Sequence, residues 1–215
     1  MLPDIKPEER AYIEGIFGEQ TESFLEQTRT FLTILLEENE KHNLIGENTV
    51  AAIWQRHILD SLQLTSYLTN STSEVIIDLG SGGGFPSIPL AIAMKTLGIK
   101  KHFILVEKSP VKATFLRNAI AKLQLDGKIF NDVINKANFQ TLASRKKAMI
   151  TSRAFKSVAE ILAIIPDFVE EMALLKGEKW EQEIVEADNK KLLGEWQFET
   201  TMSITGVGVS LWMHR

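Results

Sequence analysis

The sequence predicts an α/β fold in which a helical N-terminal extension precedes a doubly wound, mostly parallel β-sheet. First, apolar residues recur at helical spacing over residues 1 to about 70. Second, after a polar loop at residues 70–73, short apolar runs alternate with helical stretches. Third, a glycine-rich loop directly follows the first of those runs. Strands and helices that alternate in this way form βαβ units with parallel strands.

Two long helices are predicted in the N-terminal extension. Over residues 21–40, apolar side chains recur three and four positions apart and fall on one helix face. These are Phe24, Leu25, Phe31, Leu32, Leu35 and Leu36. A second helix is predicted over residues 48–68, with Asn48 as its N-cap. We therefore expect an extension of residues 1–72 that packs on a core domain of residues 73–215.

The core domain is predicted to hold seven strands with helices between the early ones. The strands are predicted at residues 75–79, 102–107, 128–131, 148–151, 170–175, 196–203 and 207–214. The helices are predicted at residues 86–95, 110–123 and 157–165. Little helix separates the last two strands. They are therefore expected to form a closing antiparallel hairpin, with Gly206 and Gly208 beside or within its turn.

The composition excludes several kinds of site. The chain has 215 residues, 44% hydrophobic and 24% charged, as is usual for a globular protein with one main domain. It has no cysteine, which excludes disulfides, thiolate zinc sites and a cysteine nucleophile. The four histidines lack metal-binding spacing, and no run of about 18 apolar residues is present. We expect a cytoplasmic protein without a metal, a membrane segment or an export signal.

The glycine loop indicates a site for a nucleoside-type cofactor. An apolar strand at residues 75–79 leads into a loop that contains Gly80, Gly82, Gly83 and Gly84, and Pro86 then suits the first turn of a helix. Glycines allow a ligand to lie close to the backbone at the N-terminus of that helix. A P-loop is excluded because no Gly-Lys-Ser or Gly-Lys-Thr follows.

Two carboxylates stand at the ends of the first two predicted core strands. Asp78 needs a cationic or hydrogen-bonding partner at a buried strand end, and the ammonium group of S-adenosylmethionine would supply one. Glu107 follows Gly84 by roughly 20 residues and could accept hydrogen bonds from both ribose hydroxyls, in that cofactor or in NAD. The alternatives are that Asp78 caps the following turn and that Glu107 is a solvated strand end.

The sequence lacks residues and motifs that several methyl-transfer reactions need, and this limits the possible methyl acceptors. Methylation of carbon 5 of a pyrimidine needs a covalent nucleophile, normally cysteine. Methylation of an exocyclic amine usually involves an Asn/Asp-Pro-Pro-Tyr loop, whereas the fourth core strand here leads into Thr-Ser-Arg-Ala-Phe at residues 151–155. N7 of guanine has a lone pair and no proton, so its methylation needs no general base. Arg153 could contact a guanine edge, a phosphate or the cofactor, or form a surface ion pair.

Several segments, in order along residues 30–177, resemble the RsmG (glucose-inhibited division B) family of 16S ribosomal RNA guanine-N7 methyltransferases. The most specific are Arg-His-Ile-Leu-Asp-Ser at residues 56–61 and Ser-Arg-Ala-Phe at residues 152–155. Others lie at residues 42–44, 78–89, 107–109 and 175–177. The resemblance implies a class I S-adenosylmethionine-dependent methyltransferase fold, which ends its seven-stranded sheet with an antiparallel edge. It also implies methyl transfer to N7 of a guanine in 16S rRNA, with S-adenosylhomocysteine as product.

The resemblance also assigns cofactor contacts. It implies that Gly80 and Phe85 contact the cofactor, that Ala137 and Asn138 flank its adenine, and that Arg153 lies in the same pocket. The family usually has an acidic residue at the position of Asn138, so we expect the contact with adenine to differ at that edge. No catalytic base is predicted.

Further candidates are proposed for positioning the substrate and for binding RNA. The positioning candidates are Arg153, Lys176, His57 and Asp60. Alternatively, the spacing of Arg56, His57 and Asp60 fits a local charged network on a helix. The net charge of −4 argues against bulk attraction to RNA, so a local basic patch is required. The candidates for this patch are Arg56, Lys108, Lys112, Arg117 and Lys156.

The expected partner is 16S rRNA or the small ribosomal subunit, bound by a monomer. The alternatives are a small-molecule or protein methyltransferase, which the low pI favours, and a catalytically weakened cofactor-binding protein on the ribosome, which Asn138 keeps open. A nicotinamide-dependent enzyme ranks last.

Overall fold

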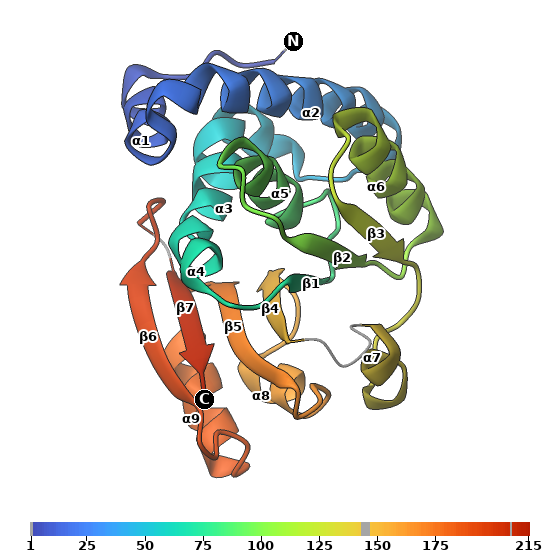
Figure 1. Ribbon diagram of the computed structural model, residues 1–215, viewed down its shortest axis with the longest axis vertical. Coiled ribbons are helices and arrows are strands. Elements are labelled where there is room, and N and C mark those ends of the chain that lie inside the picture. Colours follow the sequence, from blue (N-terminus) through green and yellow to red (C-terminus); the bar gives the residue numbers. More distant parts are fainter. Residues whose placement is uncertain (1, 143–146, 207) are drawn as a thin grey trace.

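The computed structural model describes residues 2–142, 147–206 and 208–215. Its strands form a seven-stranded sheet in the order β3-β2-β1-β4-β5-β7-β6 (Figure 1). The strands are β1 (Val75–Leu79), β2 (His102–Val106), β3 (Gly127–Phe130), β4 (Ala148–Arg153), β5 (Val169–Lys176), β6 (Gln197–Met202) and β7 (Val209–His214). β7 is antiparallel to both β5 and β6, and the other pairs are parallel. The predicted class I fold is confirmed.

The closing hairpin has the predicted glycines at its turn. Gly206 and Gly208 both have positive φ, and the amide of Ser203 donates to the Gly208 carbonyl across the turn. Residue 207, where the last strand was predicted to begin, lies outside the described residues.

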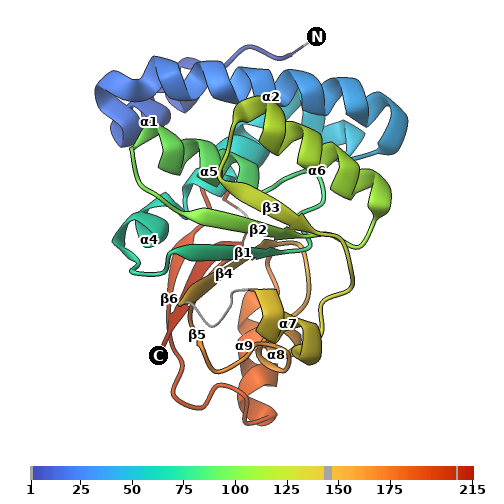
Figure 2. The same ribbon diagram turned by 45° about the vertical axis from the view of Figure 1, so that its right-hand side comes forward.

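Helices cover both faces of the sheet (Figure 2). On one face lie α1 (Pro7–Phe17), α2 (Thr21–His42), α5 (Ser87–Thr96) and α6 (Pro110–Leu123). On the other lie α7 (Lys136–Leu142), α8 (Val158–Leu162) and α9 (Trp180–Asn189). Strand β1 serves both layers, because Ile76 joins the first apolar cluster while Val75 and Ile77 join the second. A fully buried strand of this kind is typical of a doubly wound sheet.

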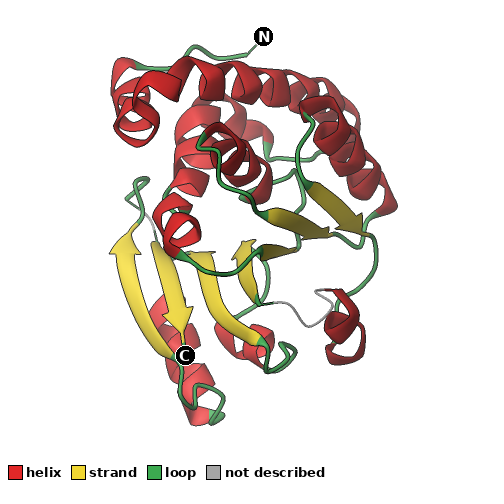
Figure 3. Cartoon of the chain, viewed as in Figure 1, coloured by secondary structure: helices red, strands yellow, loops and turns green. Residues whose placement is uncertain are grey.

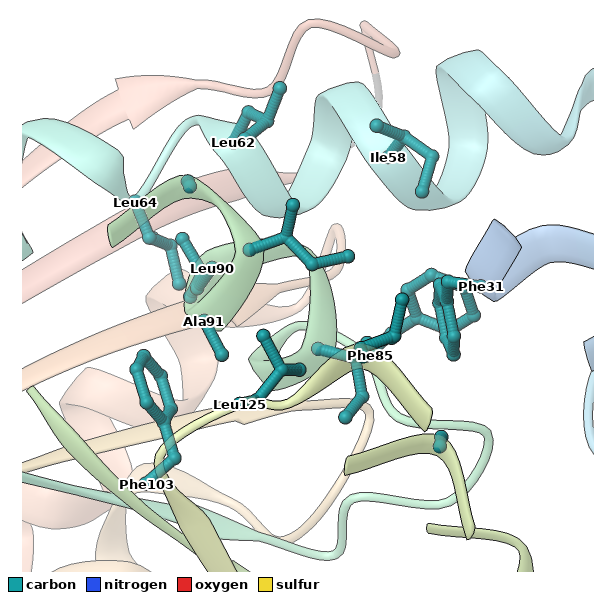
Figure 4. Close-up of a cluster of buried hydrophobic side chains, with 14 of the residues drawn as sticks. Phe31, Ile58, Leu62, Leu64, Phe85, Leu90, Ala91, Phe103 and Leu125 are labelled. Atoms are coloured by element: carbon teal, nitrogen blue, oxygen red, sulfur yellow. The ribbon is translucent and has the colours of Figure 1, made fainter. Parts of the chain in front are cut away.

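The first apolar cluster joins the N-terminal helices to the core domain. Phe31 from α2 and Ile58 from the following segment pack in the same cluster as Phe85, Leu90 and Phe103 (Figure 4). The ring centroids of Phe31 and Phe85 are 5.4 Å apart, in an edge-on arrangement. The N-terminal residues therefore help to fix the loop that follows β1.

The predicted continuous helix over residues 48–68 is wrong. The chain instead forms η2 (Glu47–Ala52), the π-helix η3 (Trp54–Leu59), α3 (Asp60–Leu62) and α4 (Thr65–Asn70) (Figure 3). Within this segment the Ser61 hydroxyl donates to the carbonyl of His57 at 2.6 Å. Single π turns are common at functional sites.

Helices α7 and α9 were missed, and α1 lies in the region predicted as helical although no helix was predicted at its bounds. Helix α7 has only seven residues, too few for a periodic pattern. Among the described residues, no helix combines the length and apolar character needed to cross a membrane.

Candidate functional site

A cavity of about 650 Å³ opens above the loop that follows β1. The strand order reverses here, because β1 pairs with β2 on one side and with β4 on the other. Ligands of open α/β sheets bind at such switch points. We call it the glycine-loop cavity. Its walls include residues 80–83 and 153–156, Leu44, Ile45, Phe85, Glu107, Lys108, Lys112 and residues 132–134.

At Gly80, the glycine loop contacts Phe155 so closely that it leaves no room for a side chain. Gly80 has a φ of +76°, and a Cβ there would lie 2.4 Å from a ring carbon of Phe155. The amide of Gly82 donates to Glu107 Oε2 at 2.9 Å, and the amide of Ser109 donates to Oε1 at 2.8 Å. The Glu107 carboxylate thus joins the glycine loop to the end of β2. Each oxygen retains a second lone pair for a ligand hydroxyl.

Asp78 lies beneath the loop and does not line this cavity. Its side chain is fully buried, and neither carboxylate oxygen has a hydrogen-bond partner. Burial raises the pKa of the Asp78 carboxyl to about 7, while the nearby hydroxyls of Ser81 and Ser87 and the charge of Arg153 oppose that rise. The two hydroxyls do not reach hydrogen-bonding geometry with Asp78. Its contact with the cofactor stays a prediction.

Replacing Asp78 with asparagine should stabilise the protein at neutral and alkaline pH. From the ordinary value of 3.8 up to about pH 7, the folded state holds a proton that the unfolded state releases, so the parent loses stability as the pH rises. Asparagine does not titrate, and its variant should exceed the parent by roughly 4 kcal/mol at pH 8. Thermal unfolding measured from pH 4 to 8 tests this. A gain that is constant across that range, or an equal gain for the exposed Asp188→Asn, would contradict the assignment.

Arg153, at the end of β4, connects several elements. Its Nη1 donates to the carbonyl of Arg56 at 2.8 Å, and its Nη2 donates to His57 Nδ1 at 2.7 Å. Nη1 also lies 3.6 Å from Asp60 Oδ2, and the guanidinium sits 5.1 Å from the centre of the Phe85 ring. Burial lowers the pKa of Arg153, but a guanidinium remains charged in proteins.

Asp60 and His57 surround this guanidinium. Asp60 Oδ1 accepts hydrogen bonds from Gln63 and from Ser203 in the hairpin turn, and burial raises the pKa of the Asp60 carboxyl. Burial, followed by the charges of Arg153 and Arg56, lowers the pKa of His57 to about 3. His57 and Asp60 therefore form a charged network with Arg153, which is distant in the sequence. The alternative of a local helical network with Arg56 is wrong, because the π-helix separates these residues and the Arg56 side chain is exposed.

A second cavity, of about 450 Å³, adjoins the first. We call it the hairpin cavity, because Ser203, Thr205 and Val209 of the closing hairpin line one side. Thr49, Arg56, His57 and Asp60 also line this cavity. Residues 153–156 line both cavities, so Arg153 stands at their junction.

Comparison with known proteins decides the family. The model for GidB, described as rRNA small subunit methyltransferase G, matches residues 24–206. The chain belongs to the GidB family. The resemblance seen in the sequence motifs is thus confirmed.

Two curated relatives carry the name ribosomal RNA small subunit methyltransferase G. The one from Dinoroseobacter shibae is 34% identical over 178 residues, 80% of this chain and 84% of the relative. The one from Cereibacter sphaeroides is 37% identical over 139 residues, and the match spans 65% of each protein. An O-methyltransferase from Bacillus cereus, solved in complex with SAH, has a TM-score of 0.54 and 13% identity. That match covers 86% of this chain and 91% of the other, and it supports the fold alone.

In this GidB protein Lys176 is buried and paired. Its Nζ donates to the carbonyl of Lys156 and forms an ion pair with Glu183, both at 2.7 Å. Glu183 also accepts from the amide of Val158. Gly208 packs against the same strand end, since a Cβ there would lie 2.0 Å from the Lys176 carbonyl oxygen. Lys176 therefore stabilises the wall of the hairpin cavity. Its ammonium group already has a backbone carbonyl and a carboxylate as partners.

The basic candidates are distributed over both cavities. Lys108 and Lys112 line the glycine-loop cavity, and Arg56 lines the hairpin cavity. Lys156 lines both, although it pairs with Glu160 at 2.9 Å. Arg117 is exposed on α6 and lines neither.

Ala137 and Asn138 do not line the glycine-loop cavity. Asn138 Oδ1 accepts from the amide of Asn135, and its Nδ2 donates to the carbonyl of Val133 at 2.9 Å. A carboxylate has no donor and could not make the second bond. The asparagine at this position therefore has a structural role. Residues 132–134, which follow β3, line the cavity instead and were missed. Their position after a parallel strand at the switch-point edge was the available signal.

Proposed function

We propose that this chain transfers a methyl group from S-adenosylmethionine to N7 of a guanine in 16S ribosomal RNA, leaving S-adenosylhomocysteine. The observation that carries the proposal is the pair of adjoining cavities that share the wall of residues 153–156. A donor held over the glycine loop and an acceptor in the hairpin cavity would meet at Arg153. The family name of the relatives supports ribosomal RNA as the acceptor.

The residues of the glycine-loop cavity fit the proposed cofactor. Side chains are absent along Gly80, Gly82 and Gly83, and the Glu107 carboxylate offers free lone pairs at the wall. Residues 80–83 and Glu107 would hold the nucleoside, and Phe85 lines the same wall. When bound, S-adenosylmethionine supplies a methyl group activated by its sulfonium.

The hairpin cavity suits an acceptor that needs no deprotonation. The neutral His57 already accepts from Arg153, so it is not a free base. Positive charge moves onto the purine as N7 is methylated, and the carboxylate of Asp60 on the cavity wall would stabilise it. Arg153 retains N–H groups that could donate to O6 of guanine, which leaves the N7 lone pair free to take the methyl group. Positioning and electrostatics would then supply the rate enhancement.

We further propose that the protein acts as a monomer in the cytoplasm and without a metal, with the small ribosomal subunit or its RNA as partner. Residues 1–72 would serve as an extension that completes the acceptor side, since Thr49, Arg56, His57 and Asp60 come from it. Across the described ranges, no group of three or more histidine or acidic side chains is placed to hold a metal ion.

The direct test is incubation with isotope-labelled cofactor and either small subunits or naked 16S rRNA. Nuclease digestion and mass spectrometry then locate the label. We expect label on N7 of one guanine. Label on a different atom of the RNA, on protein or on a small molecule would overturn the assignment. Calorimetry compares the binding of S-adenosylhomocysteine with that of NADH, and binding of NADH alone would indicate a nicotinamide-dependent enzyme.

Reversing the charge of Arg56 should weaken RNA binding selectively. Its side chain is exposed and lines only the hairpin cavity, so Arg56→Glu should lower RNA affinity by about tenfold at moderate salt. The slope of log affinity against log salt concentration should fall by about 1. Filter binding over a salt series gives both quantities, and cofactor affinity should stay unchanged. Arg117→Glu is the matched control, and an equal loss there would contradict a contact specific to the cavity.

A further inference from the structure

Arg153 is held by a hydrogen-bond chain whose direction can be deduced from the donors. A guanidinium has donors only, so His57 Nδ1 must be the acceptor in its 2.7 Å contact with Arg153 Nη2. The neutral ring therefore carries its proton on Nε2, which donates to Thr49 Oγ1 at 2.8 Å. The Thr49 hydroxyl donates in turn to the carbonyl of Gly46 at 2.6 Å. Each group in the chain thus has one defined role.

The chain ends next to the glycine-loop cavity. Gly46 precedes η2 and follows Leu44 and Ile45, which line that cavity. The carbonyl oxygen of Leu44 lies 3.0 Å from where a Cβ on Gly83 would be, so this segment rests directly on the glycine loop. The hydrogen bonds therefore connect the cover of the cofactor site with Arg153 at the junction of the two cavities.

The His57 ring lies against Phe85 and Arg153. Its ring packs on Phe85 with centroids 4.7 Å apart, and the guanidinium of Arg153 lies over the same Phe85 ring. Without the Thr49 hydroxyl, the buried Nε2–H loses its acceptor, and it can regain one only if the ring turns. A turned ring no longer offers Nδ1 to Arg153 Nη2, so the guanidinium loses one of the contacts that hold it.

We propose that Thr49 is a positioning residue that anchors the His57 ring through Nε2 and thereby holds Arg153 between the cavities. This inference rests on the proposed function for its kinetic consequence. Nothing in the sequence motifs pointed to Thr49, because its partner lies in a different turn and its effect reaches Arg153 only through the ring. The conservative pair Thr49→Ser and Thr49→Val separates the hydroxyl from the shape of the side chain.

The kinetic test uses the full chain with small-subunit RNA. Thr49→Val should lower kcat by about tenfold, because a displaced Arg153 misplaces the acceptor. The KM for RNA and the affinity for S-adenosylhomocysteine should change little. Thr49→Ser should keep nearly the parent kcat, since it retains the hydroxyl. Equal losses of kcat in the two variants would overturn the proposal.

A spectroscopic test needs no activity. Nitrogen-15 NMR of histidine-labelled protein should show a hydrogen-bonded Nδ1 in His57 of the parent and of Thr49→Ser, and a changed Nδ1 shift in Thr49→Val as the bond from Arg153 is lost. An unchanged Nδ1 shift in the valine variant would overturn the proposal even if kcat falls. If Thr49→Val does not fold, Thr49→Ala takes its place in both tests. Absence of methyl transfer by the parent would instead defeat the proposed function and leave the NMR result to judge Thr49.

Discussion

Replacement of Arg153 by methionine is expected to lower kcat for methyl transfer by about 100-fold. Methionine keeps the contact with Phe85 but removes the cation and its hydrogen bonds to Arg56 and His57. The charge at the junction of the two cavities is lost, and the acceptor loses its oriented donors. Single-turnover kinetics with saturating cofactor measure the loss directly. The exposed Arg117→Met is the control and should behave like the parent.

The same substitution should also reduce the free energy of unfolding, by about 2 kcal/mol, because Asp60 is left without its cation in a largely buried site. Adding Asp60→Asn should restore much of that stability and none of the rate. Chemical denaturation of the single and double variants separates the two roles. A double variant that regains activity would show that Arg153 serves only to neutralise Asp60.

Substitution of Gly80 by alanine is expected to lower cofactor affinity by at least about tenfold. The new Cβ would meet the Phe155 ring at 2.4 Å, so the ring must leave the wall that both cavities share. The backbone adds a penalty of about 1 kcal/mol, since φ at this position is +76°. Calorimetry with S-adenosylhomocysteine measures the affinity.

Gly98 offers a matched control for that variant. Its φ is +70°, close to that of Gly80, but a Cβ there would have no atom within 4 Å. Gly98→Ala should therefore lose stability through the backbone alone and bind the cofactor like the parent. Equal affinities in the two alanine variants would contradict the contact with Phe155.

The sequence predicted the parts of the fold that depend on local patterns. Alternating apolar runs gave the parallel strands, and the glycine loop with Glu107 gave one wall of the first cavity. The contact of His57 with Arg153 could not be predicted, because it joins residues 96 positions apart through packing. The local bond of Asn138, whose amide donates to the carbonyl of Val133, was not predictable from the sequence either.

The position of β7 has a consequence for how the protein is made. Among the described strands it is the last to be synthesised, yet it lies between β5 and β6. While the ribosome still holds residues 209–214, β5 keeps one unpaired edge and β6 has no neighbour in the sheet. Ser203, the partner of Asp60, lies in the same hairpin. A nascent chain can thus form its glycine loop early, but it gains a complete acceptor side only after β7 has been released and inserted.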